Sequence, residues 1–564
     1  MTLKIVYCGF GPSPAISSWI LREFVTRLQN SAAKIISVVI SPEGGVLRHR
    51  LLILSLLFCS KMGPAQSANC SGDLPDAPIL FARTGITLFQ QSAASAPPTR
   101  QTPPSSQTKP GAASSEDPGA ADHVASLPEA VNTPDPDLTM FPHSRTARYW
   151  ISGQTNTIFQ AKPGFHSPYQ GPNSLDNAGE YKTSLVETLY LGYQPHHNLR
   201  YNTDLLVDFE SAGGRGLGEA LGLAGFTNLD VVRNPNLGTA PYLSRGGIHQ
   251  TIGLTNEMTE SDRDQFSLAT EVPVRRFEAR IGKMGANDFM DVNDVATDSH
   301  LQFLNWTIDD NGAWDYAADT RGYTVGGLLE YDDRNWSARY GIFAMPVIAN
   351  GIRLDWAFSR AHGQNWEYEL RHSFIPKRKG TTRILAFANT AHMGNYRLAV
   401  QHYLAGIKPS PDILSVERFG TVKYGFSWNN EQDITENLRI GTRFGWNDDH
   451  EESYAYTEVA QSAVLAADYA GTRWHRGADK IGVAFLSNAI KKDHQNYLAD
   501  GGLGFILGDG RLHYGRENIV ESYYTWHAWK GLFFALDVQH VDDPGYNRDR
   551  GPVWVEGVRG HIDF

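Results

Sequence analysis

The sequence contains no uninterrupted apolar stretch of about 18–20 residues, the length that a membrane-spanning helix requires. Its 564 residues have a mean hydropathy of -0.35. A helical membrane protein is therefore excluded. A transmembrane β-barrel is not excluded, because its strands are apolar only at alternate residues.

Cysteine and positive charge are also scarce. Cys8, Cys59 and Cys70 are the three cysteines, and all lie near the start. This excludes a cysteine zinc site or a disulfide framework in the rest of the chain. The formal net charge of -11 excludes nucleic acid as the main partner, because nucleic acid requires a basic face. The chain has no HExxH motif and no complete calcium loop, so we expect no metal and no cofactor.

Residues 1–67 are expected to form a leader with a secretory signal. Arg48-His49-Arg50 supply its basic region, residues 51–59 its apolar core and Ala65-Gln66-Ser67 a cleavage site of small residues. Because such a signal normally begins within a few residues of the start, either translation begins near residues 46–47 or the leader is unusually long. The alternative interpretation of residues 51–59 is a buried helix.

Residues 68–145 are rich in proline, alanine, serine and threonine, as in Ala96-Pro97-Pro98 and Thr102-Pro103-Pro104. A segment of this composition cannot bury enough apolar surface to become ordered. We therefore predict a flexible periplasmic arm that precedes a domain of residues 146–564.

From Tyr149 onward the side chains alternate in character with a period of two. At the end of the chain, apolar Trp554, Val558, Ile562 and Phe564 share one parity, while Arg559, His561 and Asp563 share the other. Residues 200–210, 366–374, 422–429 and 438–446 repeat the pattern. Alternation of this kind is typical of strands with one apolar and one polar face.

These strands predict an all-β fold, a closed antiparallel transmembrane β-barrel of about 16 strands (16–18). In residues 323–331 we expect Tyr323, Val325, Leu329 and Tyr331 to face outward, with the two tyrosines at opposite aromatic belts. The terminal Phe564 is similar to the sorting signal of bacterial outer-membrane barrels. A soluble β-sandwich is the alternative, and it would place the aromatic faces in a dry core.

Several segments of the barrel region resemble one known family. They are residues 153–160, 163–175, 222–226 and 391–397 and, most specifically, the motifs Arg280-Ile281-Gly282-Lys283, 287–293, 302–305, 311–314 and 318–323. Taken in their order along the chain, these segments resemble the carbohydrate-selective porins, the glucose-inducible outer-membrane porins of Gram-negative bacteria. The resemblance spans residues 145–564. It implies a barrel of about 16 strands that passes sugars by diffusion, with carbohydrate solutes and outer-membrane lipid as partners. Assembly into a homo-oligomer is left open.

The polar parity of the strands is expected to line the lumen. Arg276, Glu278 and Arg280 alternate with Phe277 and Ile281, so the charges face water if the apolar set faces lipid. Arginine suits a sugar site because its planar fork donates to adjacent hydroxyls. The same argument gives lumen positions to Arg200, Asp204, Asp208, Arg339, Glu367, Glu369, Arg439 and Arg443. The alternative for each charge is a structural ion pair.

Residues 287–321 are too irregular for a strand and are rich in Asp and Asn. We expect them to fold inward as a constriction loop, with Asp288, Asp291, Asn293 and Trp314 near the narrowest point. Lys283 and Arg321, from the motifs that carry the resemblance, complete the expected substrate-binding set. The alternative is that the Asp and Asn residues are caps and turns.

Two other classes of function compete with a porin. A barrel enzyme would require Ser, His and an acid grouped on one outward strand face, and no strand offers them. A secreted glycan-binding or glycan-cleaving β-protein would explain the pair Glu367 and Glu369, but their spacing on one strand also fits a channel wall. We therefore expect a channel and not an enzyme.

Overall fold

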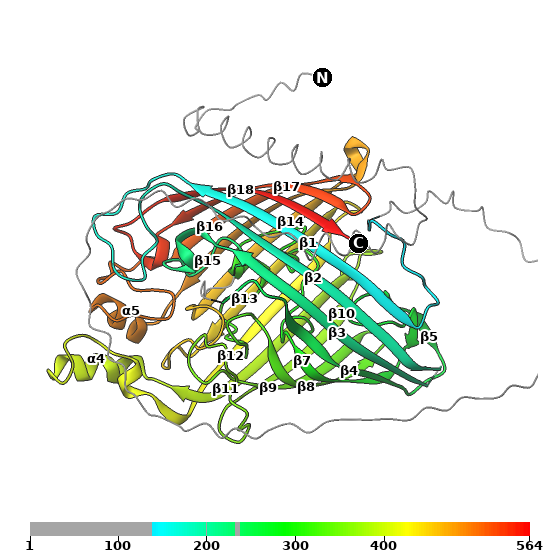
Figure 1. Ribbon diagram of the computed structural model, residues 1–564, viewed down its shortest axis with the longest axis horizontal. Coiled ribbons are helices and arrows are strands. Elements are labelled where there is room, and N and C mark those ends of the chain that lie inside the picture. The colour runs from blue at the N-terminus through cyan, green and yellow to red at the C-terminus, as the bar shows by residue number, and fades with distance from the viewer. Residues whose placement is uncertain (1–137, 199, 232–236) are drawn as a thin grey trace, which may run out of the picture. The chain divides into compact units, whose positions relative to one another are not determined.

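The alternating segments form long antiparallel strands that pair in sequence order and close into a barrel of sixteen strands (Figure 1). This computed structural model describes residues 138–564, apart from residue 199 and residues 232–236. The expected leader and most of the expected arm, residues 1–137, lie outside the described residues. The predicted barrel and its strand number are confirmed.

The barrel strands follow one another around the wall, and β5 and β6 form a separate two-stranded sheet. The strands of the wall are β1 (Tyr149–Lys162), β2 (Glu180–His197), β3 (Tyr201–Gly214), β4 (Tyr242–Gly253), β7 (Arg276–Met284), β8 (Thr324–Asp333), β9 (Trp336–Ala344), β10 (His362–His372), β11 (Gly380–Met393), β12 (Arg418–Asp433), β13 (Leu438–Asn447), β14 (Gln461–Gly471), β15 (Arg476–Ala489), β16 (Glu517–Trp529), β17 (Leu532–Asp542) and β18 (Val553–Asp563). The small sheet consists of β5 (Met258–Glu260) and β6 (Glu271–Pro273), and the helices are α3 (Trp306–Asp309), α4 (Tyr396–Leu404) and α5 (Lys492–Ala499).

The apolar parity of the strands faces outward, as the alternation predicts. Ile281 on β7 is 66% exposed, and Leu329 and Leu536 are also exposed, whereas Glu278 and Asn429 on the opposite parity are buried. A closed cylinder that is apolar outside and polar inside is stable where its outer surface meets lipid and its backbone groups are all paired within the wall.

The expected outward position of Tyr323 is wrong. Strand β8 begins at Thr324, one residue later, and the Tyr323 side chain is 7% exposed and turned into the barrel. Its hydroxyl donates to Glu210 Oε2 at 2.6 Å. Leu329 and Tyr331 keep the outward parity that was predicted for them. The two tyrosines therefore do not mark opposite aromatic belts.

The barrel closes where the last residue meets the first strand. The Phe564 amide donates to the Gly153 carbonyl at 2.9 Å, and the Gly153 amide donates to the Phe564 carbonyl at 2.7 Å. The Phe564 ring lies so close to Gly153 that an added Cβ would approach its Cε2 atom to 2.8 Å. Glycine at this position therefore allows the terminal aromatic ring to pack against the seam between β1 and β18.

The two ends of the barrel differ. At one end, called the short-turn end, tight turns such as that between β8 and β9 connect the strands. The segment 254–275, which carries β5 and β6, is the one longer connection at this end. The connections at the long-loop end carry α4 and α5 (Figure 1). None of the helices in the described part of the chain has the length and apolarity to cross a membrane.

A buried histidine joins three of the long loops. His494 of α5 stacks on Tyr396 of α4 with ring centroids 4.0 Å apart, and its Nδ1 atom lies 3.1 Å from Asp449 Oδ1. Burial alone lowers the pKa of His494, but the carboxylates of Asp449 and Glu458 outweigh it and raise the pKa to about 9. The imidazolium therefore holds the loops together at neutral pH.

Candidate functional site in the lumen

Residues 285–323, which connect β7 to β8 and are called the inward loop below, lie inside the barrel. Polar side chains on the inner wall hold its backbone. Glu521 of β16 accepts the amides of Leu304 and Asn305 at 2.5 and 3.1 Å. Arg559 of β18 donates to the carbonyls of Ser299 and Gln302 at 2.6 and 3.0 Å. The loop thus crosses the lumen and attaches to its far wall.

Two of the predicted substrate-binding residues are attachments of the inward loop. Asp291 pairs with Arg443 of β13, with Oδ2 and Nε 3.1 Å apart, and accepts from the Ser427 hydroxyl at 2.6 Å. Asn293 donates to Asn429 Oδ1 of β12 at 2.8 Å. Both side chains are buried, so they position the loop and do not line open space.

Trp314 is part of the packed interior. Its side chain is 1% exposed, and its indole nitrogen donates to Asn365 Oδ1 of β10 at 2.9 Å. The ring packs beside Tyr316, with centroids 5.2 Å apart. In this position the indole presents no face to a solute in the lumen.

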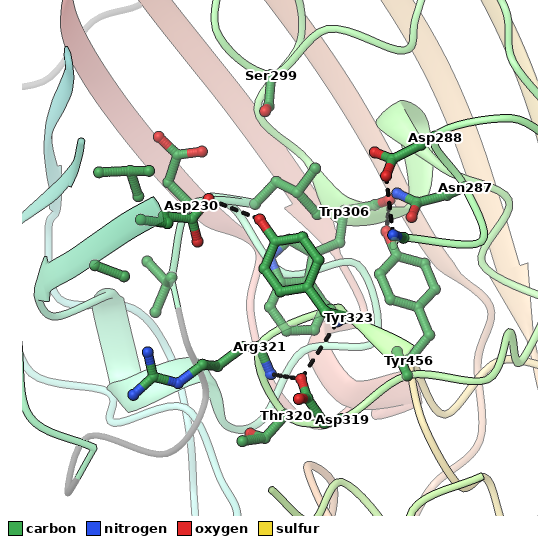
Figure 2. Close-up of a pocket in the computed structure, with 18 of the residues that line it drawn as sticks. Asp230, Asn287, Asp288, Ser299, Trp306, Asp319, Thr320, Arg321, Tyr323 and Tyr456 are labelled. Atoms are coloured by element: carbon green, nitrogen blue, oxygen red, sulfur yellow. Dashed lines mark hydrogen bonds between the residues drawn. The ribbon is translucent and has the colours of Figure 1, made fainter. Parts of the chain in front are cut away.

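A cavity of about 210 Å³ lies between the inward loop and the wall formed by β1 to β4 (Figure 2). Its lining combines aromatic rings with charged and amide groups. The aromatic residues are Tyr190, Trp306, Tyr316, Tyr323 and Tyr456, and the polar residues include Gln154, Glu210, Asp230, Arg245, Asn287, Asp288, His300, Asp319 and Arg321. Asp288 and Arg321 are therefore the predicted site residues that line this cavity.

Hydrogen bonds fix the orientation of these charged groups. Arg245 of β4 forms a bidentate pair with Asp288, with nitrogen–oxygen distances of 2.7 and 2.6 Å. Glu210 of β3 accepts from the hydroxyls of Tyr242 and Tyr323. The Arg321 guanidinium lies 3.5 Å from the centre of the Tyr242 ring. A planar cation stacked on an aromatic ring is held in orientation while its edge donors remain available.

The aromatic part of the lining is equally constrained. Trp306 and Tyr456 stack almost parallel, with centroids 5.7 Å apart and planes 8° apart. The Trp306 indole nitrogen donates to the Asn228 carbonyl at 2.7 Å, and Tyr456 donates to the Trp306 carbonyl. Each ring is therefore fixed by one hydrogen bond, and the stacked pair forms a flat part of the cavity lining.

The charges predicted on β7 lie elsewhere on the wall. Arg276 pairs with Asp332 at 2.8 Å, and Glu278 pairs with Arg280 at 3.2 Å. These residues face inward as predicted, but they do not line the cavity. Lys283 donates from Nζ to the Leu243 carbonyl at 2.8 Å, near the long-loop end of β7.

The remaining predicted lumen charges form ion pairs, with one exception. Arg339 of β9 lies 2.7 Å from Glu367 and 2.9 Å from Glu369, and Arg439 pairs with a carboxylate of β14. These contacts match the alternative interpretation of the lumen charges, in which each charge belongs to a structural ion pair of the inner wall. The exception is Arg200, which is exposed in the turn between β2 and β3.

Several residues of the site were not found from the sequence. Glu210, Arg245 and Trp306 line the cavity, and Glu521 and Arg559 attach the loop. For Glu210, Arg245, Glu521 and Arg559, the parity within the strand indicates that the side chain faces inward. It does not indicate their partners, which lie far away in the sequence. In the described part of the chain, no group of three or more His, Cys, Asp or Glu side chains could hold a metal ion.

A closed barrel with an apolar outer face and a loop folded into a polar lumen defines the porin class of channels. Residues 193–564 match the family of carbohydrate-selective porins described as the OprB family. Because this match covers more than half of the chain, the chain belongs to that family. It is an outer-membrane protein of a Gram-negative bacterium and a porin for carbohydrates, as the sequence resemblance implied.

One of three similar solved structures supports the fold. The high-pH structure of Pseudomonas putida OprB has a TM-score of 0.54 at 12% identity, covering 74% of this chain and 94% of that chain. Its low-pH structure has a TM-score of 0.38 at 10% identity, with coverages of 74% and 92%. Pseudomonas aeruginosa OccK11 (OpdR) has a TM-score of 0.36 at 10% identity, with coverages of 74% and 96%. No curated protein matches the chain.

Proposed function

We propose that the protein lets monosaccharides and small oligosaccharides diffuse passively through the lumen between the inward loop and the wall of β1 to β4. One observation carries this proposal: the cavity there joins flat aromatic rings to oriented charged groups. Pyranose faces pack on aromatic rings, and sugar hydroxyls bond to guanidinium and carboxylate groups. Selective passage also requires binding weak enough for release.

Asp288 and Arg321 are the residues that we assign to solute contact, because both line the cavity. Arg276, Glu278 and Arg280 lie toward the short-turn end of β7, which faces the periplasm in outer-membrane barrels. We assign to them the polar wall that a solute passes after the cavity. This function requires no catalytic group.

Four of the predicted site residues have a structural role in the proposed function: Lys283, Asp291, Asn293 and Trp314. Asp291, Asn293 and Trp314 are bonded to the inner wall through buried contacts. They keep the inward loop at the position where it narrows the lumen. Lys283 secures the neighbouring backbone of β4 through the Leu243 carbonyl.

The proposal includes two partners besides the solute. Outer-membrane lipid covers the exposed apolar positions of the wall, such as Ile281 and Leu329. Copies of the chain associate with one another in the same membrane.

Sugar block of single-channel current in planar bilayers tests the proposed solute contact. Arg321→Ala removes a charged donor, and hydrogen bonds to charged groups contribute about 1.5–3 kcal/mol, so glucose block is expected to weaken by roughly tenfold or more. Arg321→Lys is expected to restore it only in part, because lysine lacks the planar fork. The matched control is Arg334→Ala, whose side chain is exposed in the turn between β8 and β9. Equal block in Arg321→Ala and in the control would refute the assignment.

A further inference from the structure

The segment 254–275 at the short-turn end folds back into the barrel. Its residues 261–270, between β5 and β6, are called the tip below. Leu268 of the tip is buried against Trp150 of β1, and its amide donates to Asp204 Oδ2 of β3 at 3.2 Å. Trp150 and Asp204 both belong to the inward parity of their strands. The tip therefore enters the lumen from the end opposite to that of the inward loop.

Two charged residues of the tip hold its backbone. The Arg263 guanidinium donates to the Tyr149 carbonyl of β1 at 3.0 Å and to the Leu268 carbonyl within the tip. Asp264 Oδ1 accepts the Phe266 amide at 2.7 Å. Hydrogen bonds to charged groups are among the stronger ones in proteins. They fix the backbone from which the Phe266 side chain projects.

Phe266 of the tip contacts Phe289 of the inward loop. The two rings meet edge to face, with centroids 5.3 Å apart and planes at 75°. The Arg245 guanidinium lies 5.4 Å from the centre of the Phe266 ring, and the Arg280 guanidinium lies 4.4 Å from the centre of the Phe289 ring. Arg280 also donates to the Phe266 carbonyl at 2.9 Å. Two segments that enter from opposite ends of the barrel are thus joined within the lumen.

A second cavity, of about 40 Å³, lies beside the two phenylalanine rings, and both rings line it. Arg245 lines this cavity and also the larger one. On β3 the larger cavity is lined by Glu210, whereas the smaller cavity is lined by Leu206, which is nearer the start of the strand at the short-turn end. The smaller cavity therefore lies between the larger cavity and the end of the barrel that faces the periplasm.

We propose that Phe266 and Phe289 form a second constriction, between the larger cavity and the periplasmic exit, which sets the size limit for solutes. Both rings are only partly buried although they lie inside the barrel, so a solute that leaves the larger cavity contacts them. Edge-to-face packing and the stacked guanidiniums hold the rings in place. The constriction therefore discriminates solutes by width, whereas the charged groups of the larger cavity bind their hydroxyls. The inference rests on the proposed passage of sugars through the lumen and adds the residues that limit their size.

Swelling of liposomes that contain the full-length chain, with neutral sugars of different size, tests this constriction. Phe266→Ala removes a ring, so the swelling rate with sucrose relative to that with glucose is expected to rise severalfold. Phe266→Trp enlarges the ring and is expected to slow glucose relative to the smaller sugar xylose. Loss of folding would not produce these opposite changes. The matched control is Phe277→Ala, which removes the same ring from the outer face of β7 and is expected to leave both ratios unchanged.

A double variant tests whether the two rings act as one constriction. Phe289→Ala is expected to raise the ratio of sucrose to glucose as Phe266→Ala does, and the double variant is expected to add little, because loss of either ring opens the same passage. Heat-modifiable gel mobility verifies that each barrel is folded. Ratios equal to those of the parent chain in folded Phe266→Ala and Phe266→Trp, or an equal change in the control, would overturn the proposal. Weakened glucose block in Arg321→Ala together with such unchanged ratios would overturn the second constriction alone and leave the proposed function standing.

Discussion

Substitution of Arg443 is expected to release the inward loop while the barrel stays folded. Arg443 of β13 is buried and donates to the carbonyls of Ile308, Asp309 and Asp291 at 2.7, 2.7 and 3.0 Å. It also forms the ion pair with the Asp291 carboxylate at 3.1 Å. Removing one partner of a buried pair costs about 3–5 kcal/mol, because the other charge is left unpaired. The inward loop bears this loss, since the strand hydrogen bonds of the wall do not involve the Arg443 side chain.

Single-channel recording of Arg443→Ala measures the consequence. With the loop less firmly held, the conductance is expected to rise and glucose block to weaken. The double variant Arg443→Met with Asp291→Leu replaces the pair by apolar groups and is expected to recover much of the parent behaviour. Arg439→Ala is the control, because Arg439 lies on the same strand but pairs with Asp468 of β14. Unchanged conductance and sugar block in folded Arg443→Ala would refute the assigned role.

Three further predictions address the wall, the seam and the outer loops. Ile281→Asp places a charge in lipid, where basic residues cost about 2–4 kcal/mol and acidic ones less. Urea unfolding in liposomes should therefore show a less stable barrel for Ile281→Asp than for the control Ile281→Ala. Equal unfolding midpoints for the two variants would contradict the outward assignment of Ile281. Deletion of Phe564 removes both bonds to Gly153, so the heat-modifiable, assembled fraction in outer membranes should fall, whereas Phe564→Tyr should assemble normally. The pKa of His494 is raised from 6.5 to about 9, so its stabilisation of the loops is complete below pH 6.5 and is lost as the pH rises through about 9. Proteolysis of the outer loops should therefore accelerate above that pH, and His494→Gln should abolish this dependence.

The wall of the barrel was predictable because alternation is a local property. A side chain's parity within a strand decides whether it meets lipid or lumen, and Ile281 and Glu278 have the predicted directions. Tyr323 shows the limit of this argument. Parity has meaning only inside a strand, and Tyr323 lies one residue before β8 begins. Its side chain instead follows the inward loop and bonds to Glu210.

The site was less predictable than the wall. The residue types of Asp291 and Trp314 indicated hydrogen bonding and stacking, but not whether a solute or the protein itself would be the partner. Their partners, Arg443 and Asn365, lie on β13 and β10, far from the inward loop in the sequence. Asp288 and Arg321 differ from them only in facing open space beside β1 to β4.

The sequence by itself determined the membrane barrel, its approximate number of strands and the family, because these depend on period-two alternation and short motifs within single segments. Only the tertiary structure decided which lumen charges hold the inward loop and which remain beside the cavity. The physical reason is that a buried charge takes its role from the partner that compensates it. In a closed barrel that partner is on another strand, at a position set by the register of every strand between them.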